Sequence, residues 1–392
     1  ATLDLNGIGA TVGSLTSPVF SNSGLYGIVT NNGAQTATLT YNGTRASDTN
    51  SEIEDGSSFT AVTVTSGSLE LGGALSYSGT TTITTGANLQ IAGTPEAVAA
   101  TTDDTLAGNV TGGGNLTVGD GDKSLDLTLN GALTYTGTTK IDSNADLIIG
   151  TASSISSSSI GVFGNLDVSD STTFTVGGGT AAQTLTGAHA SNDGGGAENT
   201  ATIIAQTLAI GANGTLKPDD PSWDTTPTGV ADLTVNGSVD LTNGGLGGGT
   251  LLLQVDPDKT ATNDQLAVIN GLVTFGGILD VTASNADPFK SGDSYILINS
   301  ADGFSGAFTT VDLPTPGANQ KWVTTITSSE YIITILSPTL YWNNASGNNL
   351  WDINSSTNWN DITDAINPAV YTEGDAVNFA DIGGTSGASL PA

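Results

Sequence analysis

Closely spaced carboxylates are the residues of this sequence whose types and spacing could do chemistry. Two facing carboxyl groups can hydrolyse a glycosidic bond, and carboxylate oxygens are ligands that Ca²⁺ prefers in proteins. The acidic groups are Glu52/Glu54/Asp55, Asp103/Asp104, Asp120/Asp122, Asp219/Asp220 and Asp256/Asp258. Because Asp also bonds the local backbone in turns, turn residues are the plainer interpretation of these groups.

Asp120 and Asp122 are the candidate metal ligands. The stretch Gly119-Asp120-Gly121-Asp122 could form a loop around a calcium ion. It lacks the spacing of an EF-hand, and the calcium-binding Gly-Gly-x-Gly-x-Asp nonapeptide is absent. We therefore expect no cofactor, and we keep calcium at this pair, as part of a calcium-stabilised adhesion module, as a hypothesis.

Nucleophilic catalysis has little support. His189, the only histidine, lies in a polar stretch, and no Gly-x-Ser-x-Gly elbow accompanies it. Because the chain has no Cys, a thiol nucleophile, disulfides and a cysteine-held metal are excluded. We predict that the protein is not an enzyme. The alternative is a carbohydrate-active β-helix enzyme, which would need carboxylates that converge in a groove.

The charge balance narrows the choice of partners. Lys and Arg number 7 against 38 Asp and Glu, which gives a net charge of −31. Such a surface repels phosphate backbones and anionic lipids, so we predict no nucleic-acid binding. A groove for acidic polysaccharides would also need basic residues, which are scarce here. No apolar run reaches about 18 residues, so we expect no membrane span in this segment.

Short strands are the elements that must position these residues. Apolar residues recur in alternating runs bounded by Gly and Asn, a pattern typical of all-β chains. Aromatic residues make up only 6%, which favours a parallel β-helix, or solenoid, over a chain of thick β-sandwiches. With roughly 20 residues per layer and about 4.8 Å between layers, residues 1–335 would form about 16 layers and a rod of about 80 Å. The chain of β-sandwiches stays open as the alternative fold.

One unit of the sequence recurs. Residues 73–91 read GALSYSGTTTITTGANLQI, and residues 131–149 read GALTYTGTTKIDSNADLII, an offset of 131 − 73 = 58 residues. Internal repetition of this kind indicates stacked structural repeats. Around Asn6-Gly7 the alternation predicts two further strands separated by a turn. We interpret residues 44–60, 94–106 and 190–200 as loop insertions that present contacts on the rod.

The composition of the sequence changes at Pro338. Trp342, Trp351 and Trp359 lie close together in an Asn-rich background. We therefore predict two domains: a solenoid over residues 1–337 and a small Trp-rich β module over residues 338–392. The three Trp side chains could stack on sugars, but such a cluster is more often the core of a small module or a docking face.

The repeated unit resembles the autotransporter-associated β-strand repeat, whose Thr-Tyr-Ser/Thr-Gly-x-Thr core is matched by residues 134–139 and, with Ser76 in place of the first Thr, by residues 76–81. Residues 2–15 and 264–297 are similar to other common segments of the same proteins. The resemblance implies a right-handed β-helix of a secreted bacterial surface protein, with an extracellular location. That family repeat carries no catalytic residues.

The order of the segments suggests how copies could associate. In proteins with this repeat a Trp-rich module usually precedes a segment like residues 2–15, whereas here it lies at the other end. Either the chain is cut from a longer tandem array, or the module of one copy docks on the next through Trp342, Trp351, Trp359, Leu3 and Leu5. Head-to-tail contact of unlike ends gives a filament. We predict a structural or adhesive protein whose partners are further copies of itself, a glycan or a neighbouring cell surface.

Overall fold

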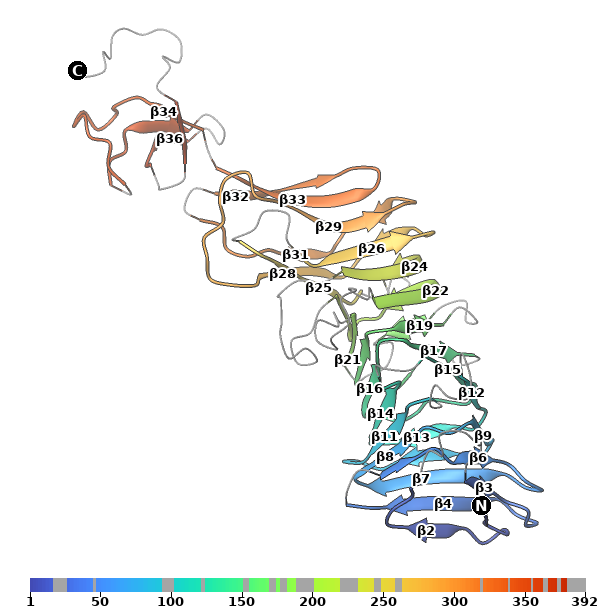
Figure 1. Cartoon of the computed structure of the whole chain (residues 1–392). Helices are drawn as coiled ribbons and strands as arrows, with labels where there is room; N and C mark the ends of the chain where they lie inside the picture. The colour runs from blue at the N-terminus through green and yellow to red at the C-terminus, as the bar shows by residue number, and fades with distance from the viewer. Residues whose placement is uncertain are drawn as a thin grey trace.

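The computed structural model is all-β and elongated, with strands stacked from one end to the other (Figure 1). It describes residues 1–16, 27–44, 47–93, 102–120, 124–150, 155–168, 174–176, 182–187, 201–218, 232–242, 248–257, 263–317, 320–337, 339–353, 355–361, 366–371 and 375–378. These residues contain no helix, and hence no helix that could cross a membrane. The prediction of an all-β chain is confirmed.

Four sheets run along the stack. Sheet A contains β1 (Thr2–Asp4), β3 (Ile28–Thr30), β6 (Glu52–Glu54) and β9 (Leu75–Ser76). Sheet B contains β13 (Val110–Gly112), β10 (Thr81–Ile83), β7 (Thr60–Ser66), β4 (Ala37–Asn42) and β2 (Ala10–Val12). Sheet C contains β31 (Thr310–Asp312), β28 (Ile278–Ala283), β25 (Thr250–Val255), β23 (Gly214–Lys217), β21 (Gln183–Gly187), β18 (Ser159–Val162), β16 (Thr138–Ile141), β14 (Asn115–Val118), β11 (Asn88–Ile91), β8 (Ser68–Leu71) and β5 (Ser47–Thr49).

From β12 onward, strands of sheet D occupy the place in each layer that strands of sheet A occupy in the earlier layers. It contains β12 (Thr102–Leu106), β15 (Leu125–Leu129), β17 (Ala145–Ile149), β19 (Asn165–Asp167), β22 (Ala201–Ile210), β24 (Asp232–Asp240), β26 (Gln265–Ile269), β29 (Ser294–Ser300), β33 (Glu330–Leu336) and β32 (Lys321–Ile326). The side strands β20 (Phe174–Val176), β27 (Val273–Phe275) and β30 (Phe304–Gly306) pair alongside. Pairing is parallel as far as β29, where β33 and β32 form an antiparallel hairpin.

Successive strands of the chain visit the sheets in a recurring order. Strands β6, β7 and β8 belong to sheets A, B and C, and β9, β10 and β11 repeat that order. Strands β12, β13 and β14 follow in sheets D, B and C. Each three-strand layer therefore pairs with the layer before it, which is why nearly all pairings are parallel.

The alternation in the sequence builds a continuous core. In sheet C one inward column runs in register through Leu69, Leu89, Leu116, Thr139, Ile160, Leu185, Leu216, Leu251 and Leu279. Each of these side chains is at most 1% exposed. The outward column of sheet B is Thr11, Thr40, Thr63, Thr82 and Thr111. Such β-branched side chains suit the half-exposed face of a pleated sheet.

The layers are longer than the sequence suggested. Leu69 pairs with Leu89, a separation of 89 − 69 = 20 residues, but Leu216 pairs with Leu251, a separation of 251 − 216 = 35 residues. Sheet C has eleven strands between residues 47 and 312. The prediction of about 16 layers at roughly 20 residues each is therefore too high, because connections lengthen in the second half of the chain.

The repeated unit forms a corner of the fold, and its two copies lie at different corners. In the first copy Tyr77 lies between β9 of sheet A and β10 of sheet B. In the second copy Tyr135 precedes β16, which belongs to sheet C. Both Tyr side chains are fully buried, and each hydroxyl hydrogen-bonds a buried Thr: Tyr77 with Thr81 (2.8 Å) and Tyr135 with Thr139 (2.5 Å). The repeat therefore conserves a local corner geometry rather than a whole layer.

We expect the buried pair of Tyr135 and Thr139 to be coupled. Thr139→Val leaves the Tyr135 hydroxyl buried without its partner, which costs about 1–3 kcal/mol of unfolding free energy. Tyr135→Phe alone also destabilises, but the double variant should lose less than the sum of the two single losses, since no orphaned hydroxyl remains. Chemical denaturation of the four proteins measures the coupling. Strict additivity would contradict it, and the Tyr77–Thr81 pair provides an internal replicate.

The interpretation of residues 44–60 as an insertion is wrong. This segment contains β5 and β6, and β6 pairs with β3 and β9 inside sheet A. Ile53 is fully buried, whereas Glu52 and Glu54 are half-exposed. Residues 94–106 likewise include β12, although 94–101 lie outside the described residues, as do 190–200. The strands predicted around Asn6-Gly7 are present as β1 and β2, but they belong to different sheets.

A fifth sheet, sheet E, follows the stack. It contains β36 (Ile366–Ala369), β35 (Trp359–Asp361), β34 (Thr339–Trp342) and β37 (Ala376–Asn378). It has its own small hydrophobic cluster around Leu340 and Trp359, separate from the core of the stack. Figure 1 shows it beyond β32 and β33, at the opposite end from β2 and β4. The predicted boundary at residue 337/338 falls between β33 and β34.

Candidate functional site

Exposed large apolar side chains fall into two groups along the described chain. Near the N-terminal end these side chains are Leu3, Ile8 and Phe59. The others are Ile269, Leu272, Ile278, Val311, Ile326, Leu336, Leu350, Trp351 and Ile353. In the part of the chain that the structure describes, none falls between residues 60 and 268. Apolar surface concentrated in this way marks contact sites more often than scattered single residues do.

The N-terminal end of the stack presents two strand edges. Among the described strands, β1 pairs only with β3 and β2 pairs only with β4. Ile28 donates its N–H to the Ala1 carbonyl (2.7 Å) and Leu5 donates to the Thr30 carbonyl (2.9 Å). Because alternate residues of a parallel strand bond to one neighbour, the backbone groups of Thr2 and Asp4 face away from β3. This end offers the hydrogen-bonding pattern that another strand would take up.

Of the two predicted docking residues at this end, only Leu3 is accessible. Leu3 is 37% exposed on β1, whereas Leu5 is 4% exposed and belongs to the core. Ile8, which was not predicted as a contact residue, is 86% exposed in the turn between β1 and β2. An apolar residue beside Asn-Gly could have been noticed as unusual for a turn, but its exposure depends on the fold.

The turn that carries Ile8 is held by several hydrogen bonds. The Asp4 carboxylate accepts from the N–H groups of Asn6 and Asn32, both at 2.9 Å. These backbone hydrogen bonds lower the pKa of Asp4. Asn31 Oδ1 accepts from the Gly7 N–H (2.8 Å), and Gly7 has a φ of 73°, a conformation that favours glycine. Ile8 is therefore presented by an ordered turn.

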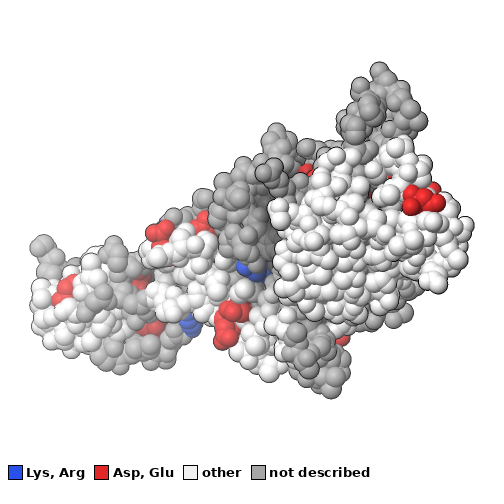
Figure 2. All heavy atoms as spheres, turned by 90° about the horizontal axis from the view of Figure 1, so that it is seen from below, with Lys and Arg blue, Asp and Glu red and all other residues white. Residues whose placement is uncertain are grey.

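The near face in Figure 2, which is the N-terminal end of the stack, is almost free of charged side chains. Among residues 1–16 the only charged side chain is Asp4, and there is no Lys, Arg or Pro. Natural proteins usually protect exposed sheet edges with charges, especially Lys, or with Pro. Residues 1–16, which hold β1, β2 and their turn, have none of these protective residues other than Asp4.

The three predicted Trp residues come together in the C-terminal module. The rings of Trp342 and Trp359 lie 5.1 Å apart between centroids, and those of Trp351 and Trp359 lie 5.7 Å apart. Trp359 is fully buried, Trp342 is half-buried and Trp351 is 53% exposed. Trp359 is therefore core, and Trp351 is the one of the three that offers most of its surface to a partner.

Leu350 and Ile353 extend the exposed surface of Trp351, and we call these three residues the module tip. Leu350 and Ile353 are each 54% exposed. The loop that bears them is fixed from behind: Asn358 Nδ2 donates to the Leu350 carbonyl (2.8 Å). Asp352 accepts from the backbone N–H (2.6 Å) and the hydroxyl (2.7 Å) of Ser356. The charge of Asp352 is thus engaged within its own loop.

Several of the acidic groups prove to be turn or ladder residues. Asp55 accepts hydrogen bonds from the N–H of Thr60 (2.7 Å) and the N–H of Ser78. Asp256 accepts from Asn285 Nδ2 (3.0 Å). These contacts fit the local structural role rather than converging carboxylates. Residues 219–220 and Asp258 lie outside the described residues.

Asp103 and Asp104 point to opposite faces because they are neighbours on β12. Asp103 is exposed and starts a column with Asp126 on β15 and Asp146 on β17. Burial raises the pKa of Asp126, and the carboxylates of Asp146 and Asp103 raise it further. Asn165 ends the column by donating to Asp146 Oδ1 (2.8 Å). The sequence analysis missed this column because it depends on strand register.

Asp104 is buried where sheet A ends and sheet D begins. It is 1% exposed, and its Oδ1 accepts the N–H of Leu75 on β9 (2.8 Å). Its Oδ2 has no hydrogen-bond partner among the described residues. Burial raises the pKa of Asp104 to about 6; the Leu75 hydrogen bond lowers it, and the charge of Asp103 raises it. Asp104 thus supports the junction between the two sheets with a carboxyl group that is costly to ionise.

The part of the chain that the structure describes contains no candidate site for a metal ion. Asp120 is half-buried after β14, and Asp122 and His189 lie outside the described residues. No group of three or more His, Asp or Glu side chains in the described ranges could hold a metal ion. Calcium at Asp120 and Asp122 therefore stays a prediction.

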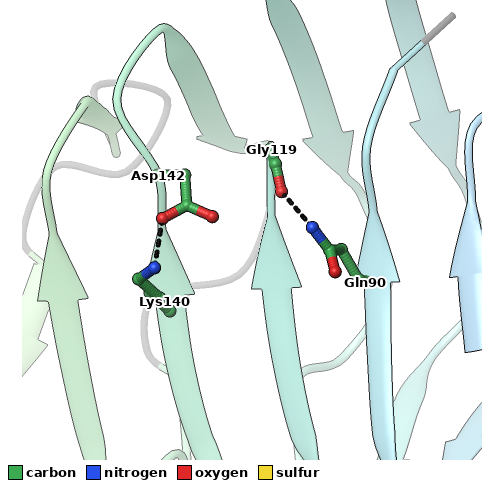
Figure 3. Close-up of polar contacts among 4 residues, drawn as sticks. All are labelled: Gln90, Gly119, Lys140 and Asp142. Atoms are coloured by element: carbon green, nitrogen blue, oxygen red, sulfur yellow. Dashed lines mark hydrogen bonds and ion pairs between the residues drawn. The ribbon is translucent and has the colours of Figure 1, made fainter. Parts of the chain in front are cut away.

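One basic residue on the outer face of sheet C, Lys140, is balanced locally. Lys140 on β16 forms an ion pair with Asp142 and lies 5.0 Å from the ring centre of Phe163. Nearby, Gln90 Nε2 on β11 donates to the Gly119 carbonyl after β14 (3.0 Å). Figure 3 shows the Lys140–Asp142 ion pair and the hydrogen bond from Gln90 to Gly119 along neighbouring strands. The hydrogen bond links neighbouring strands, and the ion pair balances charge on this face.

No protein-family model matches the sequence, and no curated protein matches it significantly.

Proposed function

We propose that the protein is a structural subunit of a bacterial cell surface, folded as a right-handed parallel β-solenoid whose unlike ends join head to tail. The observation that carries this proposal is that apolar surface is offered at both ends, by Ile8 (86% exposed) near the N-terminus and by Leu350, Trp351 and Ile353 (53–54% exposed) in the C-terminal module. A stack that joins through its unlike ends repeats the contact without closing.

The large parallel sheets support the solenoid part of the proposal. Layer after layer pairs in register, and the buried column of sheet C crosses nine strands from Leu69 to Leu279 without a break. A fold of this kind gains stability from contacts between neighbouring layers, and its length is set by their number. An extracellular location fits the absence of Cys, the acidic composition and the resemblance to autotransporter-associated repeats.

Electron microscopy and light scattering test this function. We expect the purified full chain to form filaments whose width matches one stack, and we expect their average length to grow with protein concentration. Size-exclusion chromatography with light scattering gives the mass of the species in solution. A protein that stays monomeric at all concentrations up to the millimolar range would contradict the proposal.

A further inference from the structure

We infer that the module tip, Leu350, Trp351 and Ile353, of one copy covers the N-terminal strand edges and Ile8 of a second copy. This inference rests on the proposed head-to-tail function and identifies the two surfaces that meet. The first surface comprises β1, β2 and the turn that presents Ile8. The second lies on sheet E, beyond the far end of the stack (Figure 1). One chain therefore cannot satisfy both surfaces by itself.

The N-terminal surface requires a cover for two reasons. Its backbone groups at Thr2 and Asp4 face away from β3 and pair with no other strand that the structure describes, and strand edges of this kind template further strands. The side chain of Ile8 is 86% exposed on a turn that hydrogen bonds hold in place. Its apolar surface is therefore permanently presented to water unless a partner covers it.

The module tip has matching properties. Trp351 packs edge-on against Trp359 and against Tyr371, at 5.4 Å between the ring centroids of Trp351 and Tyr371, so its ring is fixed while half of it stays exposed. Large aromatic side chains in rigid positions are the common anchors of protein interfaces. Leu350 and Ile353 add apolar surface on the same loop.

These two surfaces carry little of the charge of the molecule. In a chain with a net charge of −31, most pairs of surfaces on two copies repel each other. The only acidic side chain of the N-terminal surface is Asp4 and that of the module tip is Asp352, so each surface brings a single carboxylate to the contact. These surfaces can therefore approach each other with little electrostatic cost.

A contact between unlike ends covers more of the exposed apolar surface and strand edges than a contact between like ends. Two N-terminal ends that meet would leave both module tips exposed, and two tips that meet would leave both sets of strand edges open. The contact of a tip with an N-terminal end covers every copy except the last at each end of the filament. It is also heterologous, as an open chain requires.

Charge insertion tests the inference in the full chain. We expect Ile8→Glu and Ile353→Glu each to weaken self-association at least tenfold, because each buries a carboxylate in the contact. Ile326→Glu is the matched control: Ile326 is also apolar and 54% exposed, but it lies on β32, outside both surfaces. Melting temperatures and circular dichroism verify that the variants fold.

Disulfide trapping gives an independent readout, since the chain has no Cys. Under oxidation we expect Ile8→Cys with Ile353→Cys to give a ladder of covalent oligomers, and Ile8→Cys with Ile326→Cys to give none. If the wild-type protein forms filaments and both Glu variants do so equally well, the inference is wrong while the proposed function stands. If the wild-type protein is monomeric, the proposed function itself fails. Dimers trapped by Ile8→Cys alone would indicate like-end contact and would also overturn the inference.

Discussion

Replacing Asp104 by Asn will remove most of the pH dependence that this one carboxyl group gives to the free energy of unfolding. The pKa of Asp104 rises from 3.8 to about 6 on folding because the carboxyl group is buried. A raised carboxyl pKa means that the folded protein holds the proton more tightly than the unfolded chain. The stability associated with the protonated carboxyl is therefore fully present below pH 3.8 and is lost as the pH rises through about 6.

The size of this component follows from the pKa shift. About two pKa units correspond to about 3 kcal/mol between the protonated and ionised forms. The difference in unfolding free energy, Asp104→Asn minus wild type, should therefore increase by about 2–3 kcal/mol from pH 4 to pH 7.5. The Asn side chain keeps an acceptor for the N–H of Leu75, so the junction between sheets A and D stays bonded.

Chemical denaturation at a series of pH values measures this difference, and comparison with the wild type cancels the other carboxylates. Asp103→Asn is the matched control, because Asp103 is the exposed neighbour on the same strand. We expect its curve to follow the wild type much more closely. Parallel curves for wild type and Asp104→Asn would show that Asp104 is not a buried titrating group.

The core was predictable from the sequence because alternation directly encodes which side chains face inward. The run Leu125-Asp126-Leu127-Thr128-Leu129 places three fully buried Leu side chains on β15, as its pattern indicates. The segment around Ile53 was misjudged for a physical reason. A three-residue strand with Glu on either side of one buried Ile shows too little apolar periodicity to be distinguished from a polar loop.

The candidate site was less predictable, since exposure depends on how layers end. The pattern Leu3-Asp4-Leu5 predicts that Leu3 and Leu5 share a face, yet Leu5 is buried and Leu3 is accessible. β1 is the outermost strand of sheet A among the residues that the structure describes, and no further described strand covers Leu3. The Trp cluster was correctly expected to contain a core, but which ring stays exposed follows from the packing of sheet E. Register was the other missing information, and it alone brings Asp103, Asp126 and Asp146 into one column.

The corner at Gly237 illustrates how register creates a requirement that the sequence alone does not show. In β22 the register with β24 shifts between Ile204 and Thr207, so Ala205 and Gln206 together face Gly237. Two residues opposite one define a β-bulge. Gly237 adopts a φ of 133°, which side chains rarely allow, and a Cβ at this position would lie 1.7 Å from the Ala205 carbonyl oxygen. Gly237 also abuts Gly271 of the next layer, so displacement is blocked on that side as well.

We expect Gly237→Ala to destabilise the protein by about 3 kcal/mol or more. Backbone strain at such a φ costs about 1–3 kcal/mol, and forcing an extra methyl group into a filled site costs about 1–3 kcal/mol. Gly86→Ala separates the two causes, because Gly86 has a φ of 83° but no atom within 4 Å of the added Cβ. Its loss should therefore be about 1 kcal/mol, from backbone conformation alone. Denaturant titration of both variants measures the difference, and equal losses would show that the bulge opposite Gly237 yields to the methyl group without cost.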